Sequence, residues 1–208
     1  CRGKLEGRVE HWLKTLEIMD IGPSAITALC SYGLVKDLGD LYYLTVEQVS
    51  RALTGDKIPT RTVENILKKD RVPLWQFVCA LGIPGIGRSA SKALAKEYKT
   101  LDAIVALKDS VASAGLFEHL CSLDDFGKIT ATKLASGLSS LESTIDAIRQ
   151  VIEVEDVAEA SGPLIGKSFC ITGSLPSGAK KAEVNKRIEA AGGEIKSSVG
   201  KGLSYLIM

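Results

Sequence analysis

A phosphate-binding turn is indicated by the segment LGIPGIGRSASKAL, residues 81–94, where glycines stand directly before a run typical of a helix. Glycine has no side chain, so a ligand can approach its backbone closely. The first N–H groups of a helix have no partner inside the helix, and together with the helix dipole they favour an anion. These residue types suit a phosphate held by backbone N–H groups, with a hydroxyl and a cation in the following helix. The candidate residues are Gly85, Ile86, Gly87, Ser89 and Lys92.

This turn has two other interpretations. A glycine turn before a helix is often only a turn. The pattern GIPGIG also resembles a dinucleotide-binding fingerprint, but that motif needs a preceding β-strand and an acidic residue about 20 positions later. The preceding residues, 73–81, have a helical pattern, which argues against a dinucleotide. Backbone donors do not distinguish bases, so a nucleic acid bound here would be held by its sugar-phosphate chain without sequence preference.

Most of the chain shows the three-and-four spacing of apolar residues that indicates short helices. The expected helices are 5–18, 23–34, 45–53, 61–69, 73–81, 88–98, 101–108, 129–138 and 141–153. Residues 1–153 are therefore expected to form an all-α domain. The chain has 208 residues, of which 45% are hydrophobic, so it can bury a core. No run is apolar enough for a membrane span or a signal peptide.

The pattern changes after a stretch of small and acidic residues at 154–161, which we interpret as a linker. Residues 162–208 contain alternating segments typical of strands and one amphipathic helix stopped by glycines. This part carries seven Lys or Arg against three Glu, although the whole chain has a net charge of only +1. The excess is compatible with phosphate-bearing partners or with a solvated face. We expect a small α/β domain that is incomplete at residue 208.

The glycine turn belongs to a unit that occurs four times in the helical part. The copies lie at residues 19–29, 55–67, 81–94 and 123–134. Each joins a short apolar turn segment to a helix with small residues on its near face. Their irregular spacing excludes a solenoid of fixed period. Four related copies favour nucleic-acid binding more strongly than one glycine turn does.

These units resemble helix-hairpin-helix motifs, which bind the backbone of DNA. Nearly the whole chain also resembles the C-terminal region of bacterial-type NAD-dependent DNA ligases, in which a zinc finger precedes four such motifs and a BRCT domain. The resemblance is most specific in the segments GLVKDLGDLYYLT, ALGIPGIG and ITGSLP. It implies a mainly α fold of tandem helix-hairpin-helix motifs at 1–153, followed by a small, incomplete α/β BRCT domain at 162–208.

The resemblance implies phosphate contacts at the turns of the first, third and fourth copies. The implied residues are Gly22, Ser24, Gly85, Ile86, Gly87, Ser89, Lys92, Gly127 and Lys128. The first hairpin reads as one residue short, with Ser24 where the second glycine would stand. The second copy has Lys57, Ile58 and Pro59 instead of a glycine pair, so we expect it to bind least and the third copy best. In the fourth, Asp125 replaces the first glycine and would repel a phosphate, so this hairpin binds loosely or only packs.

Cys1 matches the last of four zinc-binding cysteines that precede the hairpins in the resembled family. A structural zinc needs four ligands, so the other three would lie upstream of residue 1. We expect no complete zinc site in this chain, and we interpret His11 and His119 as ordinary helix residues. The five cysteines are far apart in sequence, which favours reduced thiols over disulfides.

The resemblance also implies a phosphate pocket in residues 162–208. Phosphate-binding BRCT domains use a Ser or Thr and a Gly at the end of the first strand, with a Lys from the second helix. Thr172, Gly173 and Lys186 match these residues in type and order. The alternative is that Thr172 and Gly173 only shape the turn while Lys186 is solvated, and the sequence does not decide between the two.

No catalytic residues are predicted in this chain. The family takes AMP from NAD onto the lysine of a KxDG motif, and the segment TGDK at 54–57 has neither that order nor that context. NAD, Mg and Zn are implied only for the longer enzyme, with no cofactor in this region. The expected partners are duplex DNA, nicked DNA and the N-terminal adenylation domains of the same protein. The expected setting is replication and repair in the cytoplasm, without a membrane.

Two other functions are left open by the sequence. A non-enzymatic scaffold would use the hairpins for DNA and the BRCT domain for a protein partner. A repair nuclease or junction-binding subunit would also carry tandem hairpins, but would lack a BRCT domain after them. A KxDG motif and three more cysteines upstream of Cys1 would decide in favour of the ligase.

Overall fold

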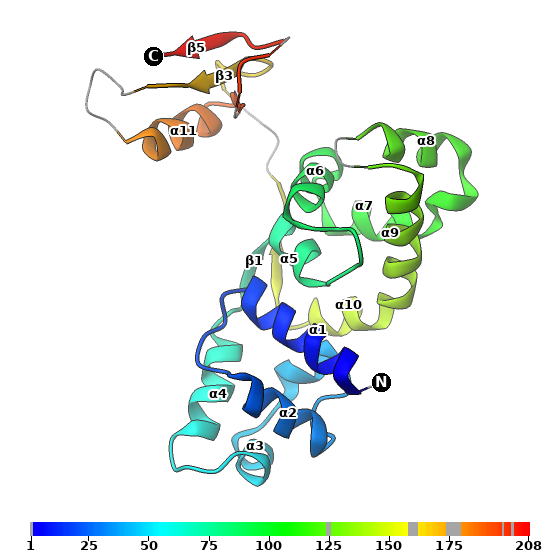
Figure 1. Cartoon of the computed structure of the whole chain (residues 1–208), viewed down its shortest axis with the longest axis vertical. Coiled ribbons are helices and arrows are strands. Elements are labelled where there is room, and N and C mark those ends of the chain that lie inside the picture. The colour runs from blue at the N-terminus through cyan, green and yellow to red at the C-terminus, as the bar shows by residue number, and fades with distance from the viewer. Residues whose placement is uncertain (1, 124–125, 158–161, 174–179, 197, 201) are drawn as a thin grey trace. The chain divides into compact units, whose positions relative to one another are not determined.

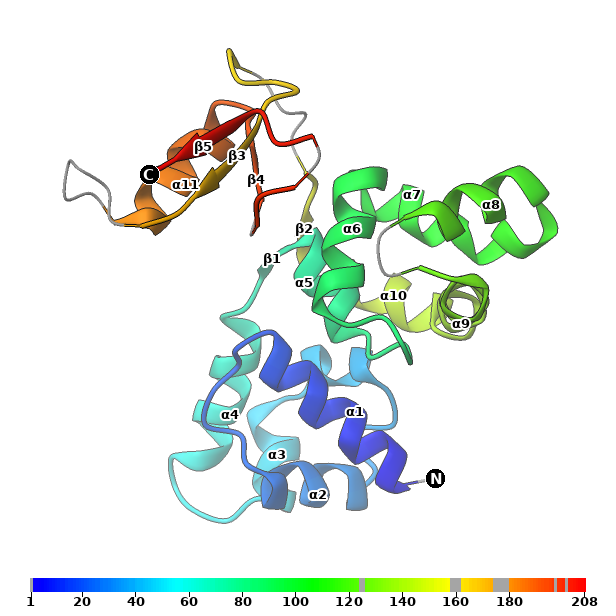
Figure 2. The same cartoon turned by 45° about the horizontal axis from the view of Figure 1, so that its top comes forward.

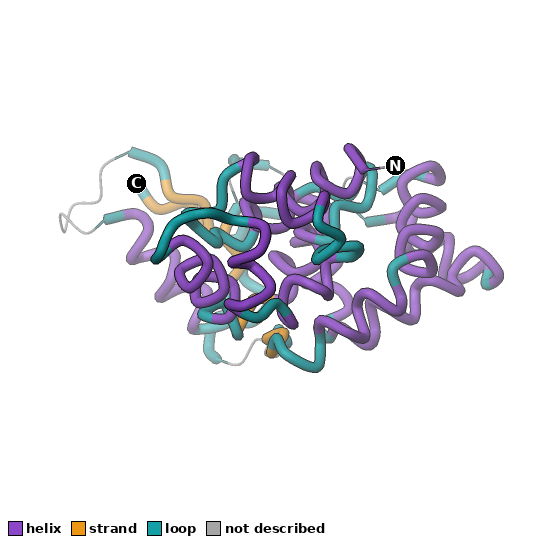
Figure 3. Tube along the Cα trace, turned by 90° about the horizontal axis from the view of Figure 1, so that it is seen from below, coloured by secondary structure: helices purple, strands orange, loops and turns teal. Residues whose placement is uncertain are grey.

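The computed structural model of the chain describes residues 2–123, 126–157, 162–173, 180–196, 198–200 and 202–208. The chain divides into two compact units, Cys1–Val157 and Ala158–Met208, and each is considered by itself. The first unit consists almost entirely of helices and loops (Figures 1 and 3), and strands carry much of the second. The predicted mainly α fold is therefore confirmed.

The helices of the first unit fall into two lobes, which are separate groups in Figures 1 and 2. The first lobe contains α1 (Arg2–Thr15), α2 (Pro23–Ser31), the 3-10 helix η1 (Leu38–Tyr43), α3 (Val46–Ala52) and α4 (Ile58–Leu67). The second contains α5 (Leu74–Ala80), α6 (Arg88–Tyr98), α7 (Leu101–Val105), the 3-10 helix η2 (Ala106–Ala112), α8 (Ala114–Ser122), α9 (Lys128–Ser140) and α10 (Glu142–Ile148). The pairs α1 and α2, α3 and α4, α5 and α6, and α8 and α9 pack together, so each predicted repeat unit forms one helical hairpin.

Two helical segments, η1 and α8, have no counterpart among the expected helices. η1 has the sequence LGDLYY, and a short 3-10 helix shows no 3.6-residue apolar period. Its start is fixed instead by Asp37, whose carboxylate accepts from the Gly39 N–H at 3.3 Å. The Asp40 carboxylate in turn accepts from the Asp37 N–H at 2.9 Å. Thr144 of α10 donates to the Asp37 carboxylate at 2.9 Å, which connects the two lobes.

One hydrophobic core runs through both lobes. Trp12 of α1 is fully buried, and its indole N–H donates to the Tyr42 hydroxyl at 2.9 Å. The Trp12 ring also meets the rings of Tyr42 and Phe77 edge to face, at centroid distances of 6.4 and 5.7 Å. Burial raises the pKa of the Tyr42 hydroxyl and so keeps it neutral. Because Phe77 lies in α5, this aromatic cluster holds the first lobe against the second.

A pair of short parallel strands joins distant parts of the first unit. The strands are β1 (Arg71–Pro73) and β2 (Glu153–Glu155). Val72 of β1 is fully buried, and Arg71 forms an ion pair with Glu153 at 2.7 Å. The predicted linker at 154–161 therefore starts too early, because its first residues belong to β2 and the unit boundary follows Val157. These strands have only three residues each, and the whole second lobe lies between them in the chain. Such short strands leave no periodic signal in the sequence.

The second unit contains a parallel three-stranded sheet and a helix. Its described elements are β3 (Ser168–Ile171), α11 (Lys181–Ala190), β4 (Glu194–Ile195) and β5 (Tyr205–Ile207), with the strand order β4-β3-β5. The helix lies between β3 and β4 in the chain, as a crossover between parallel strands requires. A Cβ at Gly193 would lie only 2.6 Å from Ile188 of α11 and 2.9 Å from Phe169 of β3, so a glycine permits this packing. The assignment of this α/β unit to the BRCT family stays a prediction.

None of the helices in the described ranges is both long and apolar enough to cross a membrane. None of the cysteines within those ranges is joined in a disulfide. They are Cys30, Cys79, Cys121 and Cys170.

The turn between α5 and α6 rests against α9. Ile83 in this turn is buried, and a Cβ at Gly137 of α9 would lie 2.6 Å from its Cγ2 atom and 3.0 Å from its Cγ1 atom. A Cβ essentially never approaches another heavy atom within 3.0 Å, so Gly137 makes this close contact possible. The third hairpin is thus seated on the second helix of the fourth.

We expect Gly137→Ala to lower the free energy of unfolding. Overpacking a buried contact costs about 1 to 3 kcal/mol, which outweighs the gain of about 1 kcal/mol from replacing a helical glycine. Urea unfolding followed by circular dichroism measures the change. Gly115→Ala in α8 is the matched control, because nothing lies within 4 Å of a Cβ there, and it should leave stability unchanged or raised. A Gly137→Ala variant as stable as the unmodified chain would contradict this account.

Candidate nucleic-acid interface

The third turn alternates exposed glycines with buried apolar residues. Ile83 and Ile86 are buried, and the Ile86 N–H donates to the Ile83 carbonyl at 2.9 Å, which closes the turn. Gly85 is exposed and has a φ of +88°, a conformation that glycine adopts at little cost. Gly87 is exposed as well and is the N-cap of α6, with an extended backbone (φ −88°, ψ −169°). A Cβ at Gly87 would meet nothing within 4 Å, so its backbone is open to a ligand.

The first and fourth hairpins present a glycine in the same way. Gly22 is the N-cap of α2 with φ −81° and ψ 170°, and Gly127 is the N-cap of α9 with φ −126° and ψ 178°. Both are exposed, and a Cβ on either would meet nothing within 4 Å. An apolar residue precedes each of them, Ile21 and Phe126 respectively, as in the third turn. Three of the glycines singled out in the sequence thus occupy equivalent helix starts.

The first hairpin corrects one part of the prediction. Gly22 is its N-cap and so corresponds to Gly87. Ser24 is the second residue of α2, as Ser89 is of α6, and does not stand where the second glycine would. The first glycine is replaced by Asp20, whose φ of +65° matches the positive φ at that place in the third turn. Aspartate visits this conformation more readily than most residues, so an alignment by glycines alone shifts the register.

The second hairpin lacks this arrangement. Lys57, the N-cap of α4, has a helical rather than extended backbone (φ −108°, ψ −15°). Pro59, the second residue of α4, has no N–H group. Gly55 occupies the place of the first glycine with φ +115°, but the Ile58 side chain lies 3.1 Å from the position of its Cβ. The weak binding expected of this copy stays a prediction, and the geometry gives it a physical reason.

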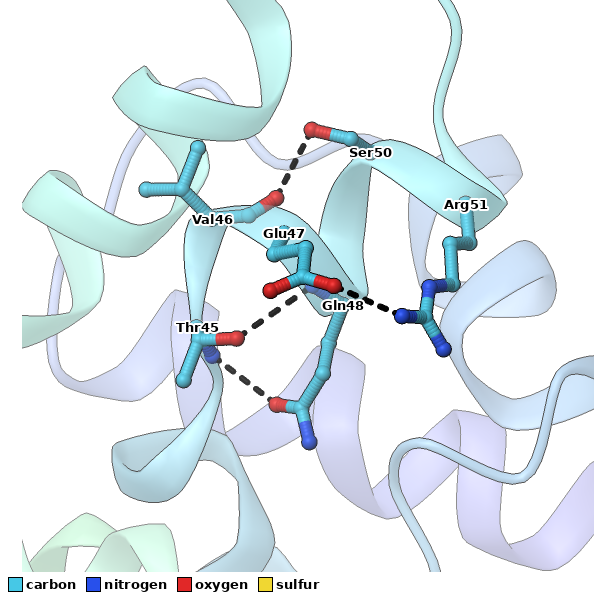
Figure 4. A network of polar contacts seen from close by, with 6 residues as sticks. All are labelled: Thr45, Val46, Glu47, Gln48, Ser50 and Arg51. Atoms are coloured by element: carbon cyan, nitrogen blue, oxygen red, sulfur yellow. Dashed lines mark hydrogen bonds and ion pairs between the residues drawn. The ribbon is translucent and has the colours of Figure 1, made fainter.

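In the helices that follow the four turns, no N-cap side chain accepts a hydrogen bond from the N–H groups at the helix start. α2, α4, α6 and α9 have no acidic residue in the first turn and no side-chain hydrogen bond at the N-cap. In α3, by contrast, the Thr45 hydroxyl accepts from the Gln48 N–H at 3.3 Å, and the Gln48 side chain accepts from the Thr45 N–H at 3.0 Å (Figure 4). Glu47 adds a negative charge to that turn and pairs with Arg51 at 2.7 Å. Such a capping box satisfies a helix start from within, whereas the N–H groups at the start of the hairpin helices have no such side-chain acceptor.

Basic side chains surround the third turn. Arg88 and Lys92 of α6 lie over the ring of Trp75, at 5.4 and 5.1 Å from its centroid. The stem of the Lys133 side chain, from α9, passes the turn, with its Cδ atom 3.9 Å from the position that a Cβ on Gly85 would take. Within the described ranges none of these three cations forms an ion pair. Lys92 is singled out by the sequence, whereas Arg88 and Lys133 emerge only from the structure, because the turn motif does not specify them.

A cavity of about 840 Å³ lies beside the third turn. It is lined by residues 81–87, by the end of α9 and by α1, which contributes Lys4, Arg8 and His11. The Nη2 atom of Arg8 is buried and finds no hydrogen-bond partner among the described residues. Unlike Arg8, His11 has a hydrogen-bond partner, because its Nε2 atom lies 2.9 Å from the Cys79 carbonyl oxygen. Two further basic residues, Lys4 and Arg8, therefore line the same cavity as the turn.

The first turn is held by α4 much as the third is held by α9. Arg61 of α4 forms an ion pair with the Asp20 carboxylate at 2.8 Å, and Asn65 donates to the Met19 carbonyl at 3.0 Å. The ion pair offsets the negative charge that Asp20 brings to this hairpin. The hairpins are therefore arranged in two pairs. In each pair, the second helix of one hairpin supports the turn of the hairpin before it: α4 supports the first turn and α9 supports the third.

The fourth hairpin carries the predicted Lys128 as the first residue of α9, where it is exposed. Ile129 beside it is 74% exposed, so an apolar side chain stands where the first and third hairpins have a serine. Asp125 lies outside the described residues, and its repulsion of a phosphate stays a prediction.

In the second unit, the predicted phosphate pocket is only partly defined. Thr172 follows β3 directly, and its N–H donates to the Ile207 carbonyl at 2.9 Å. Gly173 has a φ of +68°, so the chain turns sharply there. Lys186 is exposed on α11. Residues 174–179, between these two places in the chain, lie outside the described residues, and the pocket stays a prediction.

A metal site is not defined by the described residues, among which no three His, Cys, Asp or Glu side chains gather around one point. Cys1, the expected zinc ligand, lies outside them. His119 lies in α8, with its Nε2 atom 2.8 Å from the Glu97 carboxylate.

Comparison with known proteins bears on the hairpins and on the whole chain. The family profile of the helix-hairpin-helix motif matches residues 76–136, which include the third and fourth turns. A DNA ligase of Sorangium cellulosum is 29% identical over 211 residues, and one of Flavobacterium psychrophilum is 30% identical over 220 residues. A DNA ligase of Natronomonas pharaonis is 32% identical over 217 residues.

All three alignments cover 100% of this chain. The chain is similar throughout to the C-terminal region of DNA ligases. It spans about 30% of the length of these ligases, so it corresponds to a part of such a protein. Within this ligase-like region, the helix-hairpin-helix match falls on the lobe that contains the third turn and its surrounding cations.

Replacing Gly85 or Gly87 with alanine should lower the free energy of unfolding by different amounts. Gly85→Ala places a side chain at φ +88° and should lower the free energy of unfolding by about 1 to 2 kcal/mol. Gly87→Ala meets neither strain nor contact, and should cost about 0.5 kcal/mol because alanine is a poorer N-cap. Urea unfolding of the two variants side by side measures the difference. Equal losses would show that the turn differs from the one described.

Proposed function

We propose that this chain is the region of an NAD-dependent DNA ligase that holds duplex DNA around a nick, without base preference and without the active site. The observation that carries the proposal is the set of three exposed N-cap glycines, each opening a helix that has no cap of its own. They are Gly22, Gly87 and Gly127. The similarity of the whole chain to DNA ligases supports DNA as the ligand.

Each of these helix starts offers backbone N–H groups to one phosphate, and the helix dipole favours the negative charge. At the third turn, Arg88, Lys92 and Lys133 supply positive charge beside the backbone donors. Donors directed at phosphates do not read base edges, so the same contacts form on any sequence. Because the first and third turns each rest against a helix of the neighbouring hairpin, their phosphate sites are held in place before DNA binds.

In the longer protein, we assign the transfer of AMP from NAD, with Mg²⁺, to N-terminal adenylation domains that would act on the nick while this region holds the duplex. Cys1 would be one ligand of a zinc site completed by the residues before it. This division of labour fits a chain that spans about 30% of its ligase relatives. We place the activity in the cytoplasm, in DNA replication and repair.

The second unit is proposed to be part of a BRCT domain. Its parallel sheet and the crossover helix α11 support the assignment, and the sharp turn at Gly173 exposes backbone at the end of β3. In this proposal Thr172 and Gly173 meet Lys186 around a phosphate carried by DNA or by a protein partner.

Binding of the chain to duplex DNA should be independent of sequence and sensitive to salt. If about three to four phosphates are neutralised, the plot of log K against log salt concentration should have a slope of about −3. Fluorescence anisotropy with labelled duplexes of equal length and different sequence measures both properties. A strong preference for one sequence would indicate base readout and contradict the proposal.

The double variant Gly87→Ala with Gly127→Ala should weaken DNA binding fivefold or more, with a loss of about 1 kcal/mol or less in the free energy of unfolding. A methyl group at each place projects into open space, so it obstructs a phosphate without disturbing the fold. Gly115→Ala in α8 is again the control and should bind like the unmodified chain. Loss of affinity only in proportion to loss of stability would show that these glycines serve the turn and not the ligand.

A further inference from the structure

Trp75 of α5 carries two cations on its ring. It is half-buried, whereas Trp12, the other tryptophan of the chain, is fully buried. The Cζ atom of Arg88 lies 5.4 Å from the centroid of the Trp75 ring, and the Nζ atom of Lys92 lies 5.1 Å from it. Arg88 and Lys92 are four residues apart in α6, so they share one face of the helix.

This placement is unfavourable for the helix by itself. A positive charge in the first turn of a helix opposes the helix dipole, and two like charges four residues apart repel each other. α6 has no acidic residue in its first turn, and within the described ranges neither Arg88 nor Lys92 has an ion-pair partner. Electrostatic attraction to the negative face of the Trp75 ring therefore holds both side chains in place.

We infer that Trp75 is a positioning residue for DNA binding, which holds the side chains of Arg88 and Lys92 at the start of α6 so that they bind the phosphates next to the one at Gly87. A guanidinium that lies on an aromatic face keeps its N–H groups available at its edge, and an ammonium keeps donors that point away from the ring. Restricting two long side chains before the ligand arrives lowers the entropy that binding would otherwise cost. The inference rests on the proposed function and adds a residue that does not itself contact the ligand.

Two other roles for Trp75 make different predictions. If it only packs between α5 and α6, its loss should lower stability and leave the contribution of the two cations intact. If it stacks directly on a base, its loss should weaken binding even when the cations are absent. A positioning role requires that the effect of Trp75 on affinity disappear together with the cations.

The first experiment compares three variants in DNA-binding assays on the whole chain. Arg88→Gln with Lys92→Gln should weaken binding about tenfold at 0.1 M salt and reduce the salt slope by about 2, because two phosphate contacts are lost. Trp75→Leu should weaken binding about fivefold. Trp75→Phe keeps an aromatic face and should stay within about twofold of the unmodified chain. A matched control, Lys36→Gln with Lys99→Gln, removes the same charge after the C-terminal ends of α2 and α6, away from the N-caps of these helices, and should change binding about twofold or less.

The second experiment adds Trp75→Leu to the variant that already lacks both cations. We expect less than about 1.5-fold further loss of affinity, the signature of coupling between the ring and the cations. In the free protein, loss of the two cations should make Trp75 fluorescence more accessible to acrylamide, while buried Trp12 contributes a constant background. The fluorescence test applies even if Trp75→Leu fails to fold.

Three results would overturn the inference. One is a full fivefold effect of Trp75→Leu in the absence of the cations, and another is unchanged acrylamide quenching when the cations are removed. The third is normal DNA binding by Arg88→Gln with Lys92→Gln. If Gly87→Ala with Gly127→Ala still weakens binding in that case, the proposed function stands and only the role of Trp75 falls. A chain that binds no duplex DNA at all would overturn both.

Discussion

The helical unit depends on the burial of one apolar side chain directly before each N-cap glycine. Ile86 and Phe126 are almost fully buried, and Ile21 is half-buried in the same place. Each side chain anchors its turn in the core, so the residues on either side of it must face solvent. The hydrophobic effect thus exposes the glycine backbone, although the apolar residue itself has no chemistry to offer a ligand.

A second constraint fixes the turns relative to one another. Ile83 fits against Gly137 of α9, and Asp20 pairs with Arg61 of α4, so each odd-numbered turn is held by a helix of its neighbour. The contacts differ in kind, one being close apolar packing and the other an exposed ion pair. Both contacts link two hairpins into one element, although the exposed ion pair contributes less to it than the packing does. Several weak phosphate contacts on such an element act together, since little motion is lost when they form.

Sequence patterns were sufficient where the structure is local. The helix at 88–98 matches α6 residue for residue, and the glycines before α2, α6 and α9 are exposed N-cap residues. The patterns failed where the decisive contact is distant in the chain. In the first turn, Asp20 takes the place of the first glycine, and its positive φ is recognisable only in the structure. The sequence alone therefore misaligns this turn with the third. The pairing of β1 with β2 and the stacking of two cations on Trp75 depend on packing between segments that no local period describes.

The parallel pairing of β1 with β2 has a topological consequence. The second lobe begins directly after Pro73 and ends just before Glu153. Because the register pairs Arg71 with Glu153 and Pro73 with Glu155, the chain leaves one end of the strand pair and returns at the other end, two residues away on the neighbouring strand. The whole lobe is therefore a crossover connection between two adjacent parallel strands, and its entry and exit lie close together at opposite ends of this short pair. Chains with adjacent ends tolerate insertion and permutation well. The third and fourth hairpins are thus one continuous segment that connects to the rest of the unit at only two nearby points, so the strand pair holds them as one body.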